Sequence, residues 1–107
     1  MLAEHPRSRL VEALNNPVRF SIIAALAPVD RLAFRDLRDA LGLTDSALSK
    51  QISALEEAGL VTVNKSFIAK KPITHLSLPA EGLAAWEQHL AALREIAAGL
   101  PTPAAGE

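Results

Sequence analysis

The stretch FRDLRDALGLTDSALSKQISALEEAGLV, residues 34–61, decides the fold of this chain. Apolar residues at helical spacing lead up to Gly42, and glycine suits the left-handed position that follows a helix. Only one residue then separates Gly42 from Thr44, a good N-cap for a second helix over residues 45–58. Two helices joined by so short a turn predict a helix-turn-helix.

The second of these helices has two unlike faces. At about 100° per residue, its leucines and isoleucine fall on one narrow arc, and the opposite side carries Ser46, Ser49, Lys50 and Ser53. Serine is a poorer helix former than alanine by up to about 0.5 kcal/mol, so three serines on an exposed face add little stability. Short hydroxyls beside one ammonium group suit close approach to phosphate oxygens and base edges. A solvated face is the alternative for an isolated helix, and the preceding helix and turn favour nucleic-acid binding.

The segment after the second helix is β-like. The runs LVTV (60–63), KSFIAKK (65–71) and PITHLSL (72–78) alternate in polarity and predict an antiparallel hairpin. Lys65, Lys70 and Lys71 give it three positive charges, with no acid from 65 to 71. Such cations near a hairpin tip can hold a phosphate backbone or enter a minor groove. The alternative is that they protect an edge strand from aggregation.

The remaining elements are predicted from helix punctuation. Pro6 opens a first helix that carries Leu10, Val11 and Leu14, and Asn16 caps a second helix over 17–27. Residues 31–34 are predicted to be briefly extended, and 79–98 to form a long last helix with a broad apolar side. The predicted fold class is mainly α with a small β-hairpin (α+β), in the order α-α-(β)-α-α-β-β-α. Residues 1–98 form one domain, and 99–107 form a disordered tail.

Composition narrows the possible functions. The 107 residues are 50% hydrophobic and include no cysteine, which excludes disulfides and thiolate metal sites. No apolar run is long enough to span a membrane and no secretory signal is present, so a cytoplasmic location is expected. The net charge of -1 is unevenly distributed. Residues up to Leu78 include ten basic and eight acidic side chains, whereas those from Pro79 onward include one basic and four acidic side chains. We find no phosphate loop, nucleophile elbow or paired carboxylates, and we expect no enzyme and no cofactor.

Three stretches together resemble a known family: LNNPVRFSIIAAL (14–26), residues 34–61, and VNKSFIAKKPITHLSLPAEG (63–82). In this order they are similar to small single-domain winged helix-turn-helix transcriptional regulators of the MarR/ArsR type. The resemblance implies a winged helix-turn-helix fold, a recognition helix over 45–58, a wing over 65–71 and a homodimer held by the first and last helices. The chain departs from the family pattern at Arg35, Ala69 and Pro79, which leaves the wing tip and the helix starts open.

Together these features predict a sequence-specific regulator of double-stranded DNA, a repressor that binds a pseudo-palindromic operator. The predicted DNA-binding residues are Arg35, Thr44, Ser46, Ser49, Lys50, Ser53, Lys65, Lys70 and Lys71. The predicted dimerisation residues are Leu10, Leu14, Leu83, Trp86, Leu90, Leu93, Ile96 and Ala97. Two alternatives stay open: a winged-helix module that contacts only proteins, and a repressor that senses a metal or an unknown small molecule.

Histidine and tryptophan are the side chains that could have a role in binding a metal or an effector. His5, His75 and His89 are widely separated and have neither an i, i+4 partner nor a thiol, so no metal site is predicted. Trp86 could line an effector pocket, but a single tryptophan on an apolar helix face more often packs or contacts a partner subunit.

Overall fold

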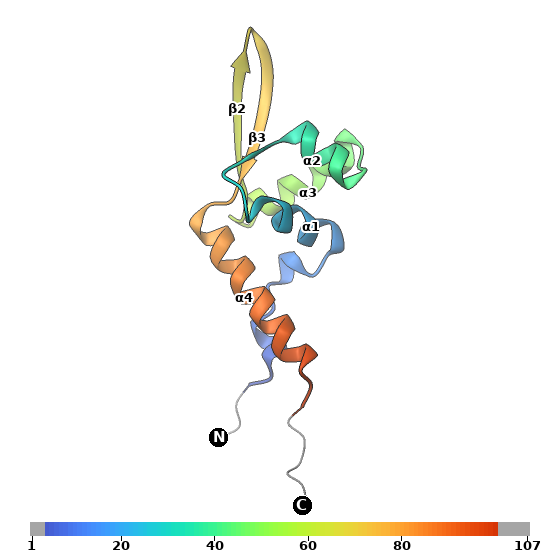
Figure 1. The fold of residues 1–107 in the computed structure, drawn as a ribbon, viewed down its shortest axis with the longest axis vertical. Coiled ribbons are helices and arrows are strands. Elements are labelled where there is room, and N and C mark those ends of the chain that lie inside the picture. The colour runs from blue at the N-terminus through green and yellow to red at the C-terminus, as the bar shows by residue number, and fades with distance from the viewer. Residues whose placement is uncertain (1–3, 101–107) are drawn as a thin grey trace, which may run out of the picture.

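The structure, a computed structural model of the 107-residue chain, describes residues 4–100. Figure 1 shows a helical body with a long hairpin at one end and the N- and C-terminal segments at the other. The elements in chain order are the 3₁₀ turns η1 (Pro6–Arg9) and η2 (Glu12–Leu14), helix α1 (Pro17–Leu26), strand β1 (Leu32–Ala33), helices α2 (Phe34–Leu41) and α3 (Asp45–Glu57), strands β2 (Thr62–Ile68) and β3 (Lys71–Ser77), and helix α4 (Ala80–Ala97). This order confirms the predicted α+β fold class.

The first predicted helix is wrong in kind, because residues 6–14 form two 3₁₀ turns. Leu10 and Val11 between them have extended backbone, with ψ of 141° and 112°. This conformation lets the Val11 N–H donate to Nδ1 of His89 on α4, at 3.0 Å. An α-helix through this segment would instead direct that N–H along its own axis.

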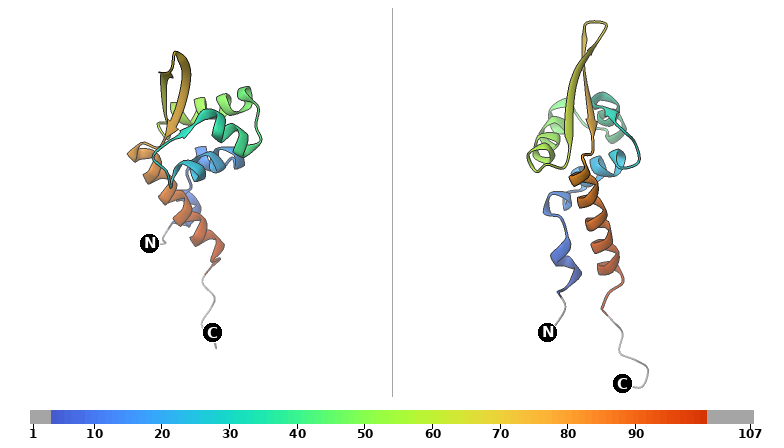
Figure 2. Two further views of the ribbon diagram at one scale, coloured as in Figure 1. Left: turned by 45° about the horizontal axis from the view of Figure 1, so that its top comes forward. Right: turned by 90° about the vertical axis from the view of Figure 1, so that its left-hand side faces the viewer.

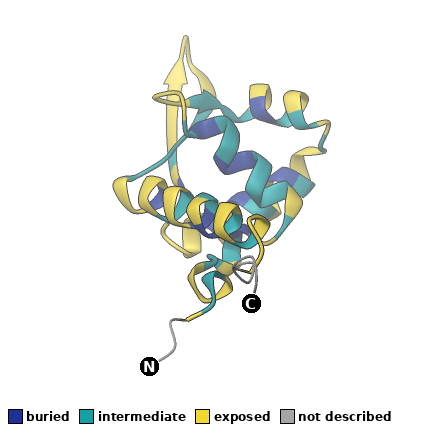
Figure 3. Cartoon of the chain, turned by 60° about the horizontal axis from the view of Figure 1, so that its bottom comes forward, coloured by how far each residue is buried: buried dark blue, intermediate teal, exposed yellow. Residues whose placement is uncertain are grey.

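Helix α1 begins where the sequence predicts. The Asn16 side chain accepts hydrogen bonds from the N–H groups of Val18 and Arg19, at 2.9 and 3.0 Å, and Pro17 occupies the first helical position. Ile22, Ile23 and Leu26 of α1 are fully buried. They form a core with buried residues of η2, α2, α3, β3 and the α3–β2 connection. These residues are Leu14, Leu37, Leu48, Ile52, Leu55, Leu60, Val61 and Leu76. Figure 3 shows the buried positions on the inner sides of the helices.

The sheet has three antiparallel strands in the order β1-β3-β2. Strands β2 and β3 pair from Thr62↔Ser77 to Ile68↔Lys71, whereas β1 covers only Leu76 and His75 of β3. The outer part of the β2–β3 hairpin therefore extends beyond the body of the molecule, as the views in Figure 2 show. We call residues 65–71 of this hairpin the wing.

Candidate nucleic-acid interface

Helix α3 presents the two faces that the sequence predicts. Leu48 and Leu55 are fully buried and Ile52 is 5% exposed. The predicted contact residues on the opposite side are all exposed: Ser46, Ser49, Lys50 and Ser53. The helix is thus anchored through one side, and its hydroxyl groups and ammonium group are available to a ligand.

Two glycine-containing turns hold α3 in place. Gly42 has φ 65° and Gly59 has φ 76°, in the left-handed region that favours glycine. After α3, the Leu60 N–H donates to the Leu55 carbonyl and the Gly59 N–H to that of Glu56, both at 2.9 Å, which is a Schellman motif. The turn at Gly42 before α3 and the turn at Gly59 after it therefore fix the two ends of the helix that carries the serines.

Thr44 caps the start of α3. Its Oγ1 accepts the Ala47 N–H at 3.1 Å and lies 3.4 Å from Oγ of Ser46. A hydroxyl has one proton and two lone pairs, so the capping bond leaves Thr44 a donor. This exposed residue at a helix start fits the predicted phosphate contact.

Arg38 of α2 contributes to the structure of this interface, and the sequence did not predict its role. It donates to Asp39 at 2.9 Å and to Asp45, the first residue of α3, at 2.8 Å. The hydrogen bonds to Asp39 and Asp45 raise the pKa of its guanidinium, which stays charged in any case. The contact joins α2 to α3 and compensates a carboxylate that would otherwise repel phosphate.

A groove of about 540 Å³ separates α3 from the wing. Its lining includes three predicted DNA-binding residues, Ser49, Ser53 and Lys65. Glu56 also lines it, so one part of its wall is acidic. The groove brings the α3 face and the wing together, although ten or more residues separate them in the chain.

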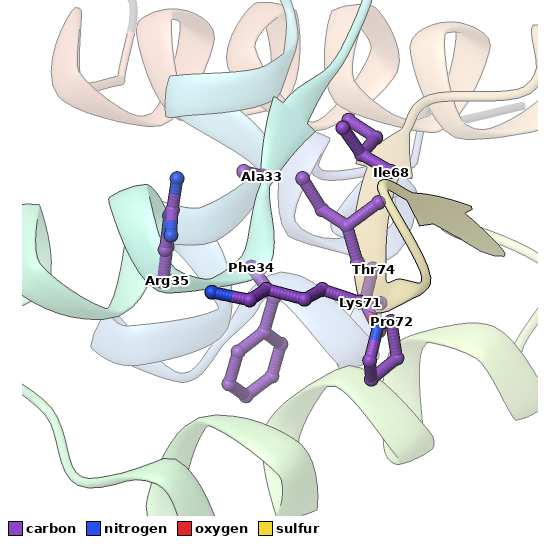
Figure 4. Close-up of a pocket in the computed structure, with 8 residues that line it drawn as sticks. Ala33, Phe34, Arg35, Ile68, Lys71, Pro72 and Thr74 are labelled. Atoms are coloured by element: carbon purple, nitrogen blue, oxygen red, sulfur yellow. The ribbon is translucent and has the colours of Figure 1, made fainter.

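A second groove, of about 350 Å³, brings Arg35 and Lys71 together (Figure 4). Arg35 lies in the first turn of α2, and the Lys71 side chain extends from β3 across the groove toward it. The floor and walls are mostly apolar, and include Phe34 and Ile73; the described residues that line it include no carboxylate. Two cations in a lining that contains no carboxylate make this groove suitable for an anion.

Lys70 lies at the tip of the wing. Lys65, Lys70 and Lys71 are all exposed, and the turn consists of Ala69 and Lys70 with φ of 50° and 66°. Two successive positive φ values are characteristic of a type I′ turn, which matches the twist of a tight hairpin. Ala69 therefore occupies a glycine-like conformation without being glycine.

The predicted dimerisation residues divide into two groups. Leu14 is 2% exposed within a single chain, so its prediction as a contact to a partner is wrong: it belongs to the core. Trp86 packs its ring 4.9 Å from that of Phe20, so part of its surface is also used within the chain. A groove between α1 and α4 remains open, and Leu83, Trp86 and Leu90 line it.

The rest of the predicted set lies on α4 and in the N-terminal segment. Leu10, Leu93 and Ile96 are half-buried, and Ala97 is exposed. Leu83 is 41% exposed. Leu93, Ile96 and Ala97 are not part of the lining of the groove beside α1.

The histidines do not form a cluster. Residues 4–100 contain no group of three His, Cys, Asp or Glu side chains that could hold a metal ion. His89 is 1% exposed, and burial lowers its pKa below the ordinary value of 6.5. Its Nδ1 accepts the Val11 N–H, which requires an unprotonated Nδ1. Within the described part of the chain, no helix is long and apolar enough to cross a membrane.

A helix-turn-helix whose second helix is exposed on one face, followed by a hairpin that projects beside it, defines the winged helix-turn-helix class. The sequence model of the family described as winged helix DNA-binding domain matches residues 18–97. The chain belongs to this family. It is therefore a DNA-binding protein of the winged-helix type, as the resemblance in its sequence indicated.

Known proteins support this assignment. An uncharacterised protein of Methanocaldococcus jannaschii is 30% identical over 80 residues, which span 75% of this chain and 87% of that protein. A transcriptional regulator homologue protein from Pyrococcus horikoshii OT3 has a similar structure, with a TM-score of 0.82, 30% identity, and coverage of 94% of this chain and 100% of that chain. The S. aureus MepR–DNA complex has a TM-score of 0.70 at 16% identity, covering 85% of this chain and 74% of that one, and shows the shared fold.

Proposed function

We propose that the protein is a homodimeric, sequence-specific regulator of transcription that binds double-stranded DNA. The observation that carries the proposal is the exposed face of α3, with its three serines and Lys50, beside a basic wing across one groove. In this arrangement α3 enters the major groove, and its hydroxyls and ammonium group reach base edges and phosphates. A cytoplasmic location is part of the proposal.

The remaining predicted contacts surround α3. Thr44 and Arg35, at helix starts, contact phosphates on either side of the major groove. Lys65, Lys70 and Lys71 hold the flanking backbone. All five residues are exposed, which supports these roles.

A homodimer would place two copies of α3 in successive major grooves, about 34–36 Å apart, on a pseudo-palindromic site. The groove between α1 and α4 supports this assembly, because Leu83, Trp86 and Leu90 line it beside Glu87 and Arg94. Exposed apolar side chains with polar neighbours of this kind mark contacts with a partner. Repression is the proposed outcome of this binding.

The test is selection of bound genomic fragments, followed by anisotropy titration of the selected duplexes. Lys50→Gln should weaken binding and reduce discrimination between selected and unrelated duplexes. Arg7→Gln removes the same charge from exposed η1, at the opposite end of the molecule, and should leave discrimination unchanged. Absence of binding to any duplex at low salt would instead support a module that contacts only proteins.

A second candidate function is regulation by a small anionic effector. The groove that contains Arg35 and Lys71 favours it, because 350 Å³ lies within the range of small-molecule sites and its wall is apolar with two cations. A titration of DNA affinity against small aromatic carboxylates tests it. An effector that occupies the groove should weaken DNA binding and lose its effect in Arg35→Gln.

A further inference from the structure

Phe67 and Ile68 are unusually exposed for large apolar side chains. Their exposed fractions are 74% and 61%, and both lie at the end of β2, directly before the turn of the wing. Single exposed apolar residues are common on protein surfaces. Two in succession at the outer end of a projecting hairpin are unusual, and neither has a role in the core.

The strand register separates these two side chains. Phe67 is opposite Pro72, and Ile68 is opposite Lys71. Opposed residues of an antiparallel pair share a face of the sheet, and successive residues alternate between faces. Phe67 and Pro72 therefore form an apolar pair on one face, and Ile68 lies on the other.

The face that carries Phe67 is the one directed toward α3. Val63 and Lys65, two and four residues before Phe67, share its face by alternation, and both line the groove opposite Ser49 and Ser53. Phe67 thus lies at the outer end of the wing surface that borders the proposed DNA-binding groove. Ile68, on the other face, lines the groove that contains Arg35, and Pro72 borders that groove as well.

Charge and size decide what this pair can contact. No carboxylate occurs between Glu57 and Glu81, so the whole hairpin has only positive formal charges, from its three lysines. A stable protein interface needs about 800 Å² from each partner and a core depleted of lysine, more than one phenylalanine and one proline can provide. A minor groove about 6 Å wide, lined by phosphates, needs only one or two inserted apolar side chains.

We propose that Phe67, braced by Pro72, is a wedge that enters the minor groove and partly unstacks one base step. The lysines of the wing hold the phosphates on either side, and the DNA bends toward the major groove. This inference rests on the proposed DNA-binding function and adds to it a residue that selects deformable base steps.

The experiment uses the full chain and a selected genomic duplex of about three helical turns, with a fluorophore at each end. 2-Aminopurine replaces adenine, one position at a time, at the flexible TA and CA steps. The wild-type protein should bend this DNA by roughly 20–90° and raise the 2-aminopurine fluorescence at one step in each half-site. Phe67→Ser should abolish both signals and weaken binding roughly tenfold, as expected for the loss of a base–aromatic contact.

Ile68→Ser is the matched control, because it removes a neighbouring exposed apolar side chain from the other face of the hairpin. It should keep the bend and the fluorescence signal, and Phe67→Leu should keep most of both. Straight DNA with wild-type protein, or equal effects of Phe67→Ser and Ile68→Ser, would overturn the wedge while leaving DNA binding in place. Failure of the wild-type protein to bind any duplex would overturn the proposed function, and the wedge with it.

Discussion

Gly82 of α4 lies against the backbone of Leu60, so close that a Cβ on Gly82 would be 2.3 Å from the Leu60 carbonyl oxygen. Gly82 is a buried residue in the first turn of α4, and Leu60 lies in the connection between α3 and β2. The atom in the way belongs to the backbone and cannot rotate aside. This contact sets how closely α4 approaches the C-terminal end of α3, and therefore how the body of the molecule supports α3.

Gly82→Ala should destabilise the protein by about 1–3 kcal/mol, the usual effect of forcing an extra methyl group into a packed site. Helix propensity alone predicts the opposite sign, because alanine exceeds glycine by about 1 kcal/mol in a helix. Denaturant unfolding distinguishes the two. Ala84→Gly, at an exposed position of the same helix, measures the propensity term by itself. A stabilised Gly82→Ala would mean that α4 can move away from Leu60 at little cost.

A substitution in the turn of the wing should stabilise the β2–β3 hairpin. Ala69 has φ 50°, in the left-handed region that costs an alanine roughly 1–2 kcal/mol. Asparagine tolerates this conformation and favours type I′ turns, so Ala69→Asn should increase the protection of cross-strand amides in β2 and β3 by several-fold. Hydrogen exchange is the appropriate measurement, because the outer wing can open without global unfolding. Ser66→Asn, within an extended strand, should give no such gain.

The sequence predicted the elements whose ends are determined locally. Asn16 and Thr44 as N-caps and Gly42 and Gly59 as C-terminal positions depend on neighbours within a few residues, so their side chains alone identify the helix ends. The two faces of α3 were also predictable, because the helical period is a local property of the chain. The exposure of the three serines and Lys50 depended only on this period, and the exposure of the wing lysines on the hairpin pattern.

Features that depend on distant partners were not predictable. Val11 and His89 are 78 residues apart, and their hydrogen bond accompanies extended backbone where spacing predicted an α-helix. Leu14 shows the same limit: apolar spacing cannot distinguish a residue of the core from one at a subunit interface. The pairing of Arg38 with Asp45 depends on how the turn brings two helices together, which a single sequence does not specify.

The buried histidine should make stability depend on pH. Burial lowers the folded-state pKa of His89 below 6.5, so the unfolded chain binds the proton more readily as pH falls through this value. The contribution of the neutral ring is therefore complete above about pH 7.5 and is lost as pH falls below about 6.5. Protonation at Nδ1 also removes the acceptor for Val11. Unfolding free energies measured between pH 5 and 8 should decline toward acid in the wild type, and less steeply in His89→Gln. Equal slopes would contradict this assignment.

The subunit interface can be tested at Leu83, which borders the groove between α1 and α4 and is 41% exposed. Leu83→Glu should yield a folded monomer, because an unpaired carboxylate would be buried at the interface while the core is unaffected. Ala84→Glu changes the next residue, which is exposed on another side of α4, and should remain dimeric. Sedimentation at micromolar concentration measures both. A monomeric wild type would overturn the proposed homodimer.

The lysines of the wing should control the salt dependence of DNA binding. Lys70 and Lys71 are exposed at the outer end of the hairpin, and each phosphate they neutralise releases about 0.9 counterion. Lys70→Gln combined with Lys71→Gln should weaken binding to all duplexes alike, and should flatten the plot of log affinity against log salt by about one to two units per subunit. Arg7→Gln combined with Arg9→Gln removes the same charge from η1, at the opposite end of the molecule, and should leave the slope near its wild-type value. If both double variants reduce the slope equally, the effect belongs to net charge, and the wing does not contact the phosphates.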